Sequence, residues 1–342
     1  MADGHNPFSK VKFFPGLLYN EIVNEDRSPL VDAFRGFAVF CMVIGNFMMN
    51  ITWYPAWLKH APDIGFRFVD LGAPAFVFVI GLNYITSSRR RFERDGAWKA
   101  VQHFVIRYFA ILGLGALFGA GQVLFQIGGV SVNWGVLQAI GVAGLVTLFF
   151  IRLPAWSRLV IGLALLAFYQ FMLDRFWLSQ VLASPHGGLP GSLSWAGLLI
   201  IATVLADLYI DHSHGFRNLL AASTFSIILA LVLNAWFVIS KNRVSAPYVL
   251  LSLGLSGWFF CLFHLIINKF GWKLTFLQCW GRNPLLLYVL HLLLQGLLTL
   301  PFMPMWGEAV PPLVAFSQLA VILALLSFLA VRLDRKKLYF TV

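Results

Sequence analysis

The sequence predicts an all-α integral membrane protein, a bundle of about ten transmembrane helices. The chain has 342 residues, of which 59% are hydrophobic and 11% are charged, whereas soluble domains carry roughly a quarter charged residues. Its apolar runs approach the length of about 20 residues that a helix needs to cross the hydrocarbon core. The runs are continuously apolar and do not alternate with polar residues, which favours helices over the strands of a barrel.

Ten apolar stretches are interpreted as the membrane spans. In chain order they cover approximately residues 30–52, 68–88, 101–126, 134–151, 157–178, 194–210, 217–240, 247–268, 276–299 and 312–332. We therefore expect an N-terminal segment over 1–29, a transmembrane domain over 30–333 and a C-terminal tail over 334–342. The first segment is too polar to be a secretory signal, so the first span is expected to remain in the membrane.

The placement of basic residues predicts the orientation of the bundle. If the chain starts in the cytoplasm, seventeen Lys and Arg residues fall in inner segments and five fall in outer ones, which fits the positive-inside rule. The five outer residues are Lys59, Arg67, Arg175, Lys241 and Arg243. An even number of spans then places both termini in the cytoplasm. The net charge of +11 is accounted for by this orientation, so we expect no nucleic-acid partner.

The loop between the first two spans carries the strongest candidate for chemistry. His60 lies in this loop, Asn46 precedes it near the outer end of the first span, and Asp70 opens the second span. A carboxylate that reaches one ring nitrogen of a histidine fixes its tautomer and raises its basicity, and an amide can donate to a developing oxyanion. The alternatives are a solvated histidine in a loop and an aspartate that caps a helix.

Further polar groups lie within or beside apolar segments. Asp32 and Arg35 are three residues apart, which fits either an ion pair that eases insertion or a functional pair. Arg107, near the start of the third span, is a candidate contact for the phosphates of a cytosolic ligand. A Gly-Arg-Asn-Pro motif at residues 281–284 is followed by Tyr288 and His291, which share one helix face. His291 is expected to face the bundle interior, either as a satisfied core residue or as a ligand contact.

At these residues the chain resembles a known family. The string from Val31 to Gly36 with Asn46, followed by His60, Asp70 and the apolar run 74–81, is similar to heparan-alpha-glucosaminide N-acetyltransferases and their bacterial relatives. Weaker similarity continues through residues 135–141, 281–291 and 335–337. The resemblance spans roughly residues 30 to 340 and keeps register with the hydrophobic pattern.

The resemblance implies a membrane-embedded acetyltransferase with acetyl-CoA as donor, an amino sugar or glycan on the outer side as acceptor, and no metal. It implies His60 as nucleophile or general base, with Asn46 and Asp70 as its catalytic partners. The candidate contacts for acetyl-CoA are Arg35, Arg107, Gln138, Arg282, Asn283 and His291. Two routes stay open at this stage, an acetyl-histidine intermediate and direct transfer with His60 as the base.

Departures from the animal enzymes bear on the finer expectations. The loop before His60 is longer, Ala139 stands where those enzymes have an arginine, and the large lumenal domain that precedes their core is absent from this sequence. These features suggest a bacterial protein of the inner membrane, with family analogy suggesting a homodimer. The runner-up function is O-acetylation of a polysaccharide or lipid with the same donor. A transporter is a third alternative, disfavoured because no internal repeat or pair of broken helices is found.

Overall fold

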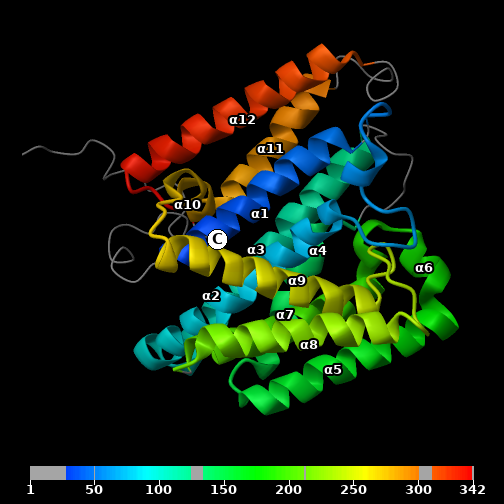
Figure 1. Cartoon of the computed structure of the whole chain (residues 1–342), viewed down its shortest axis with the longest axis vertical. Coiled ribbons are helices and arrows are strands. Elements are labelled where there is room, and N and C mark those ends of the chain that lie inside the picture. Colours follow the sequence, from blue (N-terminus) through cyan, green and yellow to red (C-terminus); the bar gives the residue numbers. More distant parts are fainter. Residues whose placement is uncertain (1–27, 50, 125–133, 212, 300–309, 341–342) are drawn as a thin grey trace, which may run out of the picture.

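The computed structural model describes residues 28–49, 51–124, 134–211, 213–299 and 310–340, so the expected N-terminal segment lies almost wholly outside the described residues. The described chain is built from helices (Figure 1). They are α1 (Pro29–Met48), α2 (Gly72–Asp95), α3 (Ala97–Leu124), α4 (Val136–Phe150), α5 (Ala155–Met172), α6 (Leu178–Leu182), α7 (Gly188–Ile210), α8 (Gly215–Leu233), α9 (Ala246–His264), α10 (Thr275–Arg282), α11 (Pro284–Thr299) and α12 (Pro312–Arg335).

The predicted fold class is confirmed. Eight helical stretches of the described chain are long and apolar enough to cross a membrane, and α4 and α11 are shorter apolar helices. The eight stretches are Pro29–Met48, Phe68–Asp95, Ala97–Gly121, Ala155–Leu182, Pro185–Ile210, Gly215–Leu233, Ala246–Lys269 and Pro312–Arg335. An isolated β-bridge joins Gly65 and Ser240.

One predicted span is divided in the structure. The stretch expected as a single helix over 276–299 forms the short α10 and then α11, with a break at Asn283. Pro284 has no backbone N–H to continue the hydrogen bonding of α10, and it suits the first position of a new helix. The side chain of Asn283 meanwhile bonds the C-terminal tail, where its Nδ2 donates to the Leu338 carbonyl at 3.1 Å and its Oδ1 accepts from Phe340 N at 2.8 Å.

Local sequence signals explain where several helices begin. Ser28 caps α1, with its side-chain oxygen accepting from Val31 N at 3.4 Å and Pro29 at the first helical position. In α4, Oε1 of Gln138 accepts from Gly135 N at 2.9 Å, so this side chain closes the first turn of its own helix. Gly96 has a φ of 78°, and this left-handed residue separates α2 from α3.

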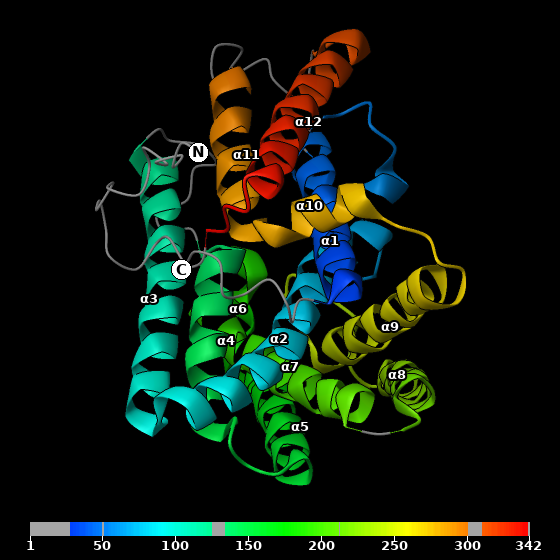
Figure 2. The same cartoon turned by 90° about the vertical axis from the view of Figure 1, so that its left-hand side faces the viewer.

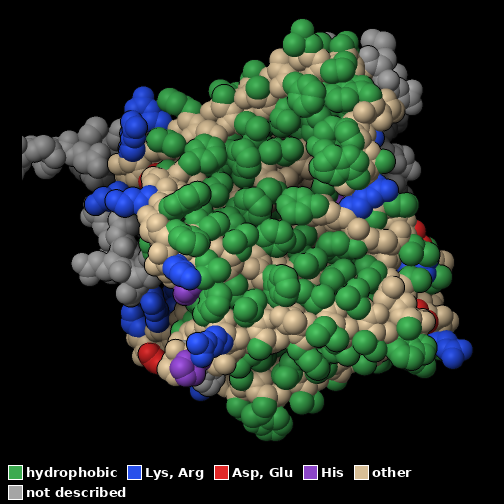
Figure 3. Space-filling view, in the orientation of Figure 1, with side chains coloured by type: hydrophobic (Ala, Val, Ile, Leu, Met, Phe, Trp, Pro, Cys, Tyr) green, Lys and Arg blue, Asp and Glu red, His purple; other side chains and the backbone are tan. Residues whose placement is uncertain are grey.

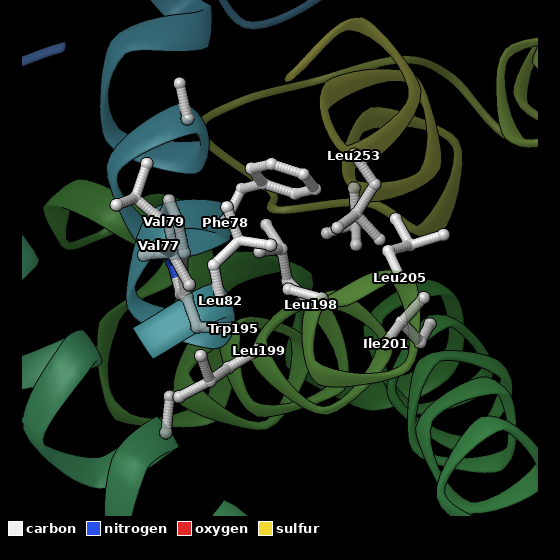
Figure 4. Close-up of a cluster of buried hydrophobic side chains, with 14 of the residues drawn as sticks. Val77, Phe78, Val79, Leu82, Trp195, Leu198, Leu199, Ile201, Leu205 and Leu253 are labelled. Atoms are coloured by element: carbon white, nitrogen blue, oxygen red, sulfur yellow. The ribbon is translucent and has the colours of Figure 1, made fainter. Parts of the chain in front are cut away.

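Helix α7 lies at the centre of the bundle. Its long apolar window is 78% buried inside the protein, compared with 22% for that of α8. Figure 4 shows side chains of α7 such as Trp195 and Leu198 packed against Phe78 and Leu82 of α2, with Leu253 of α9 nearby. These contacts hold α2 in place, so the segment that leads into α2 is fixed against a rigid core.

Ion pairs and loop contacts mark two opposite ends of the bundle. We call one the Asp32 end, where Asp32 of α1 and Asp334 of α12 both contact Arg282, so that the first and last described helices meet there. We call the other the His60 end, where the loop that carries His60 and Asp70 meets the loop between α8 and α9. In Figure 1 the Asp32 end lies at the left and the His60 end at the right.

The surface between the two ends is apolar. On the face shown in Figure 3, hydrophobic side chains cover the middle, while Lys and Arg gather mainly along the edge of the Asp32 end. Large apolar side chains are exposed along the helices, among them Leu117 of α3 and Phe225 of α8, which are 68% and 66% exposed. Figure 2 shows α3 beside α4 on one flank and α11 beside α12 above them. An apolar belt of this kind suits contact with lipid tails.

Candidate active site

His60 and Asp70 form a tight side-chain pair at the His60 end. Nδ1 of His60 lies 2.7 Å from Oδ1 of Asp70. The Asp70 side chain is fully buried, while 19% of the His60 side chain is exposed. A carboxylate at this distance favours the tautomer in which Nδ1 carries the proton. Nε2 is then left with its lone pair, as a base or a nucleophile requires.

Backbone contacts fix the position of the Asp70 carboxylate. Its second oxygen, Oδ2, accepts from Ala61 N at 3.2 Å and from Arg67 N at 2.8 Å, which closes the turn Phe68–Leu71 in front of α2. The hydroxyl of Tyr248 on α9 donates to the Asp70 carbonyl at 2.8 Å. Asp70 therefore caps the start of its helix and contacts His60 at the same time, so the two alternatives weighed from sequence coexist in the geometry.

Asn46 and His291 form a second pair, between α1 and α11. Nδ2 of Asn46 lies 3.2 Å from Nε2 of His291, and the ring of Tyr288 lies 4.8 Å from the His291 ring between centroids. The side chain of Gln295 donates to the Asn46 carbonyl at 3.3 Å. His291 is buried, and its Nδ1 has no hydrogen-bond partner among the described residues. A buried nitrogen without a protein partner is suited to a ligand or a water.

The His60–Asp70 pair and the Asn46–His291 pair lie on segments that pack against each other, although the two pairs share no residue. A Cβ placed on Gly45 would lie 3.0 Å from a methyl group of Val69, so the end of α1 packs against the turn that carries Asp70. Asn46 was predicted to act beside His60. Within the described chain its side chain hydrogen-bonds His291 of α11. This hydrogen bond therefore connects the first motif, which contains Asn46, His60 and Asp70, to the second motif, which contains His291.

The two motifs at the Asp32 end meet through a backbone contact between α1 and α10. A Cβ on Gly36 would lie 1.8 Å from the Leu277 carbonyl oxygen, and one on Gly281 would lie 1.8 Å from the Asp32 carbonyl oxygen. Arg35 donates to the Gly281 carbonyl at 2.8 Å and lies 3.5 Å from the Asp32 carboxylate. The ion pair weighed for Asp32 and Arg35 is therefore present, and it is part of a helix crossing.

The candidate donor contacts Arg282 and Asn283 are bound to protein groups. Arg282 forms an ion pair with Asp334 and lies 3.6 Å from Asp32, while Asn283 holds the C-terminal tail. Gln138 is buried at the start of α4, against Gly115 of α3. These contacts give all three residues a role in packing.

Arg107 differs from these residues. It is half-buried on α3, and within the described residues its guanidinium has no ion pair or hydrogen bond, only a contact with the Tyr108 ring at 6.0 Å. By contrast, Arg89 binds Asp207 and Asp211, and Arg94 binds Asp95. Arg107 therefore has its donors free for a ligand, whereas Arg89 and Arg94 of the nearby basic run are bound to carboxylates.

A cavity of about 430 Å³ opens at the Asp32 end. Its lining includes Ser88, Arg89, Arg152 and Arg158. Arg158 is buried, and its guanidinium binds Thr203 at 2.5 Å and also Asp207. Arg152 lies 5.1 Å from the Phe92 ring. Basic residues therefore border a hollow at this end, and the guanidinium groups of Arg89 and Arg158 are already bound to protein.

Two residues at the His60 end were missed in the sequence analysis. Lys241, in the loop between α8 and α9, is half-buried and interacts electrostatically with Asp70. Burial lowers the pKa of Lys241 to about 8, and the Asp70 carboxylate opposes that shift. His186, before α7, lies in electrostatic range of Lys241 and His60. The sequence does mark each residue weakly. His186 precedes two glycines at the edge of an apolar span, and Lys241 is one of the few basic residues assigned to the outer side.

The comparisons with known proteins agree with the motifs. The family model described as heparan-alpha-glucosaminide N-acetyltransferase, catalytic, matches residues 27–198, half of the 342-residue chain. The chain belongs to this family. The match covers both members of the His60–Asp70 pair and also His186, whereas Lys241 and His291 lie beyond it. A comparison with curated proteins finds no match.

Membership implies a membrane-embedded acetyltransferase, and enzymes of this family use acetyl-CoA as donor. The expectations of a transferase and of a multi-pass membrane protein are confirmed at this level. Among the described residues, no group of three or more His, Cys, Asp or Glu side chains is placed to hold a metal ion.

Proposed function

We propose that this protein transfers the acetyl group of cytosolic acetyl-CoA to an amino sugar at the opposite face of the membrane, with His60 as the reacting group. The observation that carries the proposal is the hydrogen bond of 2.7 Å between His60 and the buried Asp70, within the range matched by the family model. The charged CoA phosphates cannot cross a bilayer. An enzyme whose reactive histidine lies at the far end can therefore deliver the acetyl group to that side while CoA stays on the near side.

The donor is proposed to enter at the Asp32 end, which we assign to the cytoplasm because most basic residues gather there. Arg107 is the leading candidate for a phosphate contact because its donors are unused by the described protein. Arg35 is a second candidate beside the crossing of α1 and α10. The pantetheine arm would run past Asn46 and His291 towards His60. We further propose a bacterial inner membrane as the location and a homodimer as the assembly.

Two routes are compatible with a histidine held by a carboxylate. In the first, Nε2 of His60 attacks the thioester carbonyl, the C–S bond breaks and CoA leaves as the thiolate. The acceptor amine then takes the acetyl group from the imidazole, and the proton that this amine loses neutralises the thiolate. In the second, the amine attacks the thioester carbonyl directly while Nε2 removes its proton. The C–S bond breaks, and the imidazolium returns this proton to the departing sulfur, so CoA leaves as the thiol. In both routes Asp70 holds the Nδ1 proton and stabilises the imidazolium.

The test is an assay of CoA release by the purified protein in proteoliposomes, with acetyl-CoA outside and glucosamine as acceptor. Acetylated sugar should form with the wild-type protein and not with His60→Ala, while both proteins bind acetyl-CoA. A sugar that carries hydroxyls and no amine distinguishes N-acetylation from the runner-up function, because its acetylation would indicate an O-acetyltransferase. Movement of unmodified sugar across the membrane without CoA release would indicate a transporter.

Acid-quench trapping separates the two routes. The enzyme is mixed with acetyl-CoA labelled in the acetyl group, without acceptor, and quenched within one turnover. Label that stays on the wild-type chain and is absent from His60→Ala supports the acetyl-histidine route. If the chain carries no label while CoA release with acceptor is normal, direct transfer is the mechanism.

A further inference from the structure

The His60 end contains a cation that the described protein leaves unpaired. Three of the five basic residues assigned to this end are bound to protein oxygens: Lys59 to the Thr52 carbonyl, Arg67 to the His60 carbonyl, and Arg243 to the Asp63 carboxylate. Arg175 is exposed on the outside of the bundle. Lys241 is half-buried, and within the described residues it has neither a hydrogen bond nor an ion pair within 4.0 Å.

Lys241 and Asp70 form no direct hydrogen bond or ion pair. Oδ1 of Asp70 is engaged by His60, and Oδ2 accepts from two backbone amides. The Lys241 ammonium lies in the electrostatic field of this carboxylate without a direct ion pair. A half-buried ammonium has three donors to satisfy, and the described protein supplies no acceptor to it. A ligand or water is therefore needed at this position.

His186 is the second group with an unused polar atom. Its Nδ1 is buried and has no hydrogen-bond partner among the described residues. Its ring packs against Trp195 at 5.9 Å between centroids, and Trp195 Nε1 donates to the His186 carbonyl at 3.2 Å. The residue has a φ of 56°, followed by Gly187 and Gly188 at 79° and 62°. A side chain other than glycine in this left-handed region is strained, and such strain is commonly retained where a side chain must be aimed.

The loops that carry these groups are clamped to one another. Gly65 N donates to the Ile239 carbonyl at 2.8 Å, which ties the His60 loop to the Lys241 loop. Ser194 donates to the Val244 carbonyl at 2.7 Å, which ties the Lys241 loop to α7 behind His186. The Arg243 guanidinium and the Ser240 hydroxyl hold the pKa of Asp63 below its usual value, so this link between the loops stays charged at neutral pH.

From this arrangement we propose that Lys241 and His186 form an acceptor-binding subsite beside His60, which holds the hydroxyl-bearing ring of a sugar. Sugar hydroxyls both donate and accept, so one can accept from the Lys241 ammonium and another can pair with Nδ1 of His186 in either tautomer. The inference rests on the proposed function, and it adds two specificity-determining residues that come from separate loops.

Two variants test the subsite without disturbing its frame. His186→Gly removes the ring and suits the positive φ, so the backbone is expected to keep its path. Lys241→Met keeps the aliphatic stem and removes the charge. Arg175→Met is the matched control, because it removes an exposed cation near the same end. Thermal unfolding in detergent checks that all three variants fold.

The first readout is sugar binding, which does not depend on transfer. Saturation-transfer NMR with glucosamine and the protein in nanodiscs should show binding to the wild type and to Arg175→Met, with a dissociation constant raised about tenfold or more in Lys241→Met and His186→Gly. Binding of acetyl-CoA should be equal in all four proteins. Equal glucosamine binding in the four proteins, or no binding to the wild type, would overturn the subsite.

The second readout assigns the contacts. Deoxy analogues of glucosamine, each without one hydroxyl, are compared as acceptors by kcat/KM. With one analogue, the kcat/KM of the wild type should be about tenfold lower than with glucosamine, whereas the kcat/KM of Lys241→Met should be the same for both acceptors. A different analogue should give this result for His186→Gly. If, for every analogue, the loss in kcat/KM from the missing hydroxyl is as large in the variants as in the wild type, Lys241 and His186 do not contact these hydroxyls. If sugar binds as expected and no acetyl transfer occurs, the subsite stands and the proposed function fails.

Discussion

Asp70 contacts Nδ1 of His60 at 2.7 Å while two backbone amides hold its other oxygen. The carboxylate therefore cannot turn away from the imidazole without breaking the turn that starts α2. Preorganisation of this kind keeps the histidine in one tautomer before any substrate arrives. The same aspartate thus joins the folding of the second span to the chemistry proposed for the loop.

Replacing Asp70 by Asn tests this relationship. The amide can still face the loop amides through its oxygen, but it presents an NH₂ group or a weaker acceptor to His60 and favours the wrong tautomer. We expect kcat for acetyl transfer to fall by about 10²–10⁴-fold. The dissociation constant for acetyl-CoA, measured by calorimetry in detergent, should stay within about threefold of the wild-type value. A normal kcat in Asp70→Asn would remove the pair from the mechanism.

Replacing Asn46 by Ala tests whether the α1–α11 pair takes part in chemistry. If the amide donates to the thioester oxygen in the transition state, kcat should fall by about 10²–10³-fold with little change in KM for acetyl-CoA. If it only orients His291, the variant His291→Gln should lower kcat to the same extent, and the double variant should be no worse than either single one. A double-mutant cycle on the rate of CoA release distinguishes these outcomes.

Much of the fold and the contact between His60 and Asp70 could be predicted from the sequence because they depend on local signals. Apolar runs of membrane-spanning length identify the helices directly. His60 and Asp70 are ten residues apart in one short loop, so the loop itself limits their separation. The resemblance to the family covers the same residues, and the structure places them in contact.

Contacts between distant segments could not be predicted in this way. The residues 276–299 are predicted as one span because apolar residues predominate over this length, although the Asn283–Pro284 pair signals the break between α10 and α11. The partner of Asn46 is 245 residues away along the chain. His186 and Lys241 come from different loops that are brought together by helix packing, and neither position has a spacing that marks it.

Arg107 and Arg282 should respond differently to substitution. Arg107→Met is expected to raise the KM for acetyl-CoA by about tenfold or more, because a charged group that bonds phosphate is lost. The effect should largely vanish with a donor that lacks the 3′-phosphate, if that phosphate is the group bound. Arg282→Met removes an ion pair to Asp334, so it should lower the melting temperature instead. Equal KM values for wild type and Arg107→Met would exclude this donor contact.

A methyl group at Gly281 should disrupt the crossing of α1 and α10. Its Cβ would lie 1.8 Å from the Asp32 carbonyl oxygen, which belongs to the backbone and cannot rotate away. We expect Gly281→Ala to destabilise the protein by about 3 kcal/mol or more, the upper range for an overpacked site. Gly296→Ala is the control, because among the described residues no atom beyond the adjacent backbone of α11 lies within 4 Å of a Cβ there. Thermal unfolding in one detergent compares the two, and an unchanged melting temperature for Gly281→Ala would contradict the close backbone contact.

The lowered pKa of Lys241 predicts an alkaline limit for acceptor binding. With a pKa of about 8, the side chain is a charged donor below that pH and is neutral above it, whereas an unperturbed lysine stays charged to about pH 10. The Asp70 carboxylate acts electrostatically on Lys241, and His186 lies in electrostatic range of it. The kcat/KM for the acceptor should therefore fall as the pH rises through about 8, because the charge-assisted hydrogen bond to the sugar is lost.

The comparison with Lys241→Arg isolates this titration. A guanidinium keeps its proton across the whole range, so this variant should lack the alkaline fall. Lys241→Met should also lack it, at a lower kcat/KM throughout. The acceptor amine titrates in the same way for every variant and cancels in the ratio of wild type to Lys241→Arg. A ratio that stays constant from about pH 6.5 to 9.5 would show that Lys241 does not bind the sugar in its charged form.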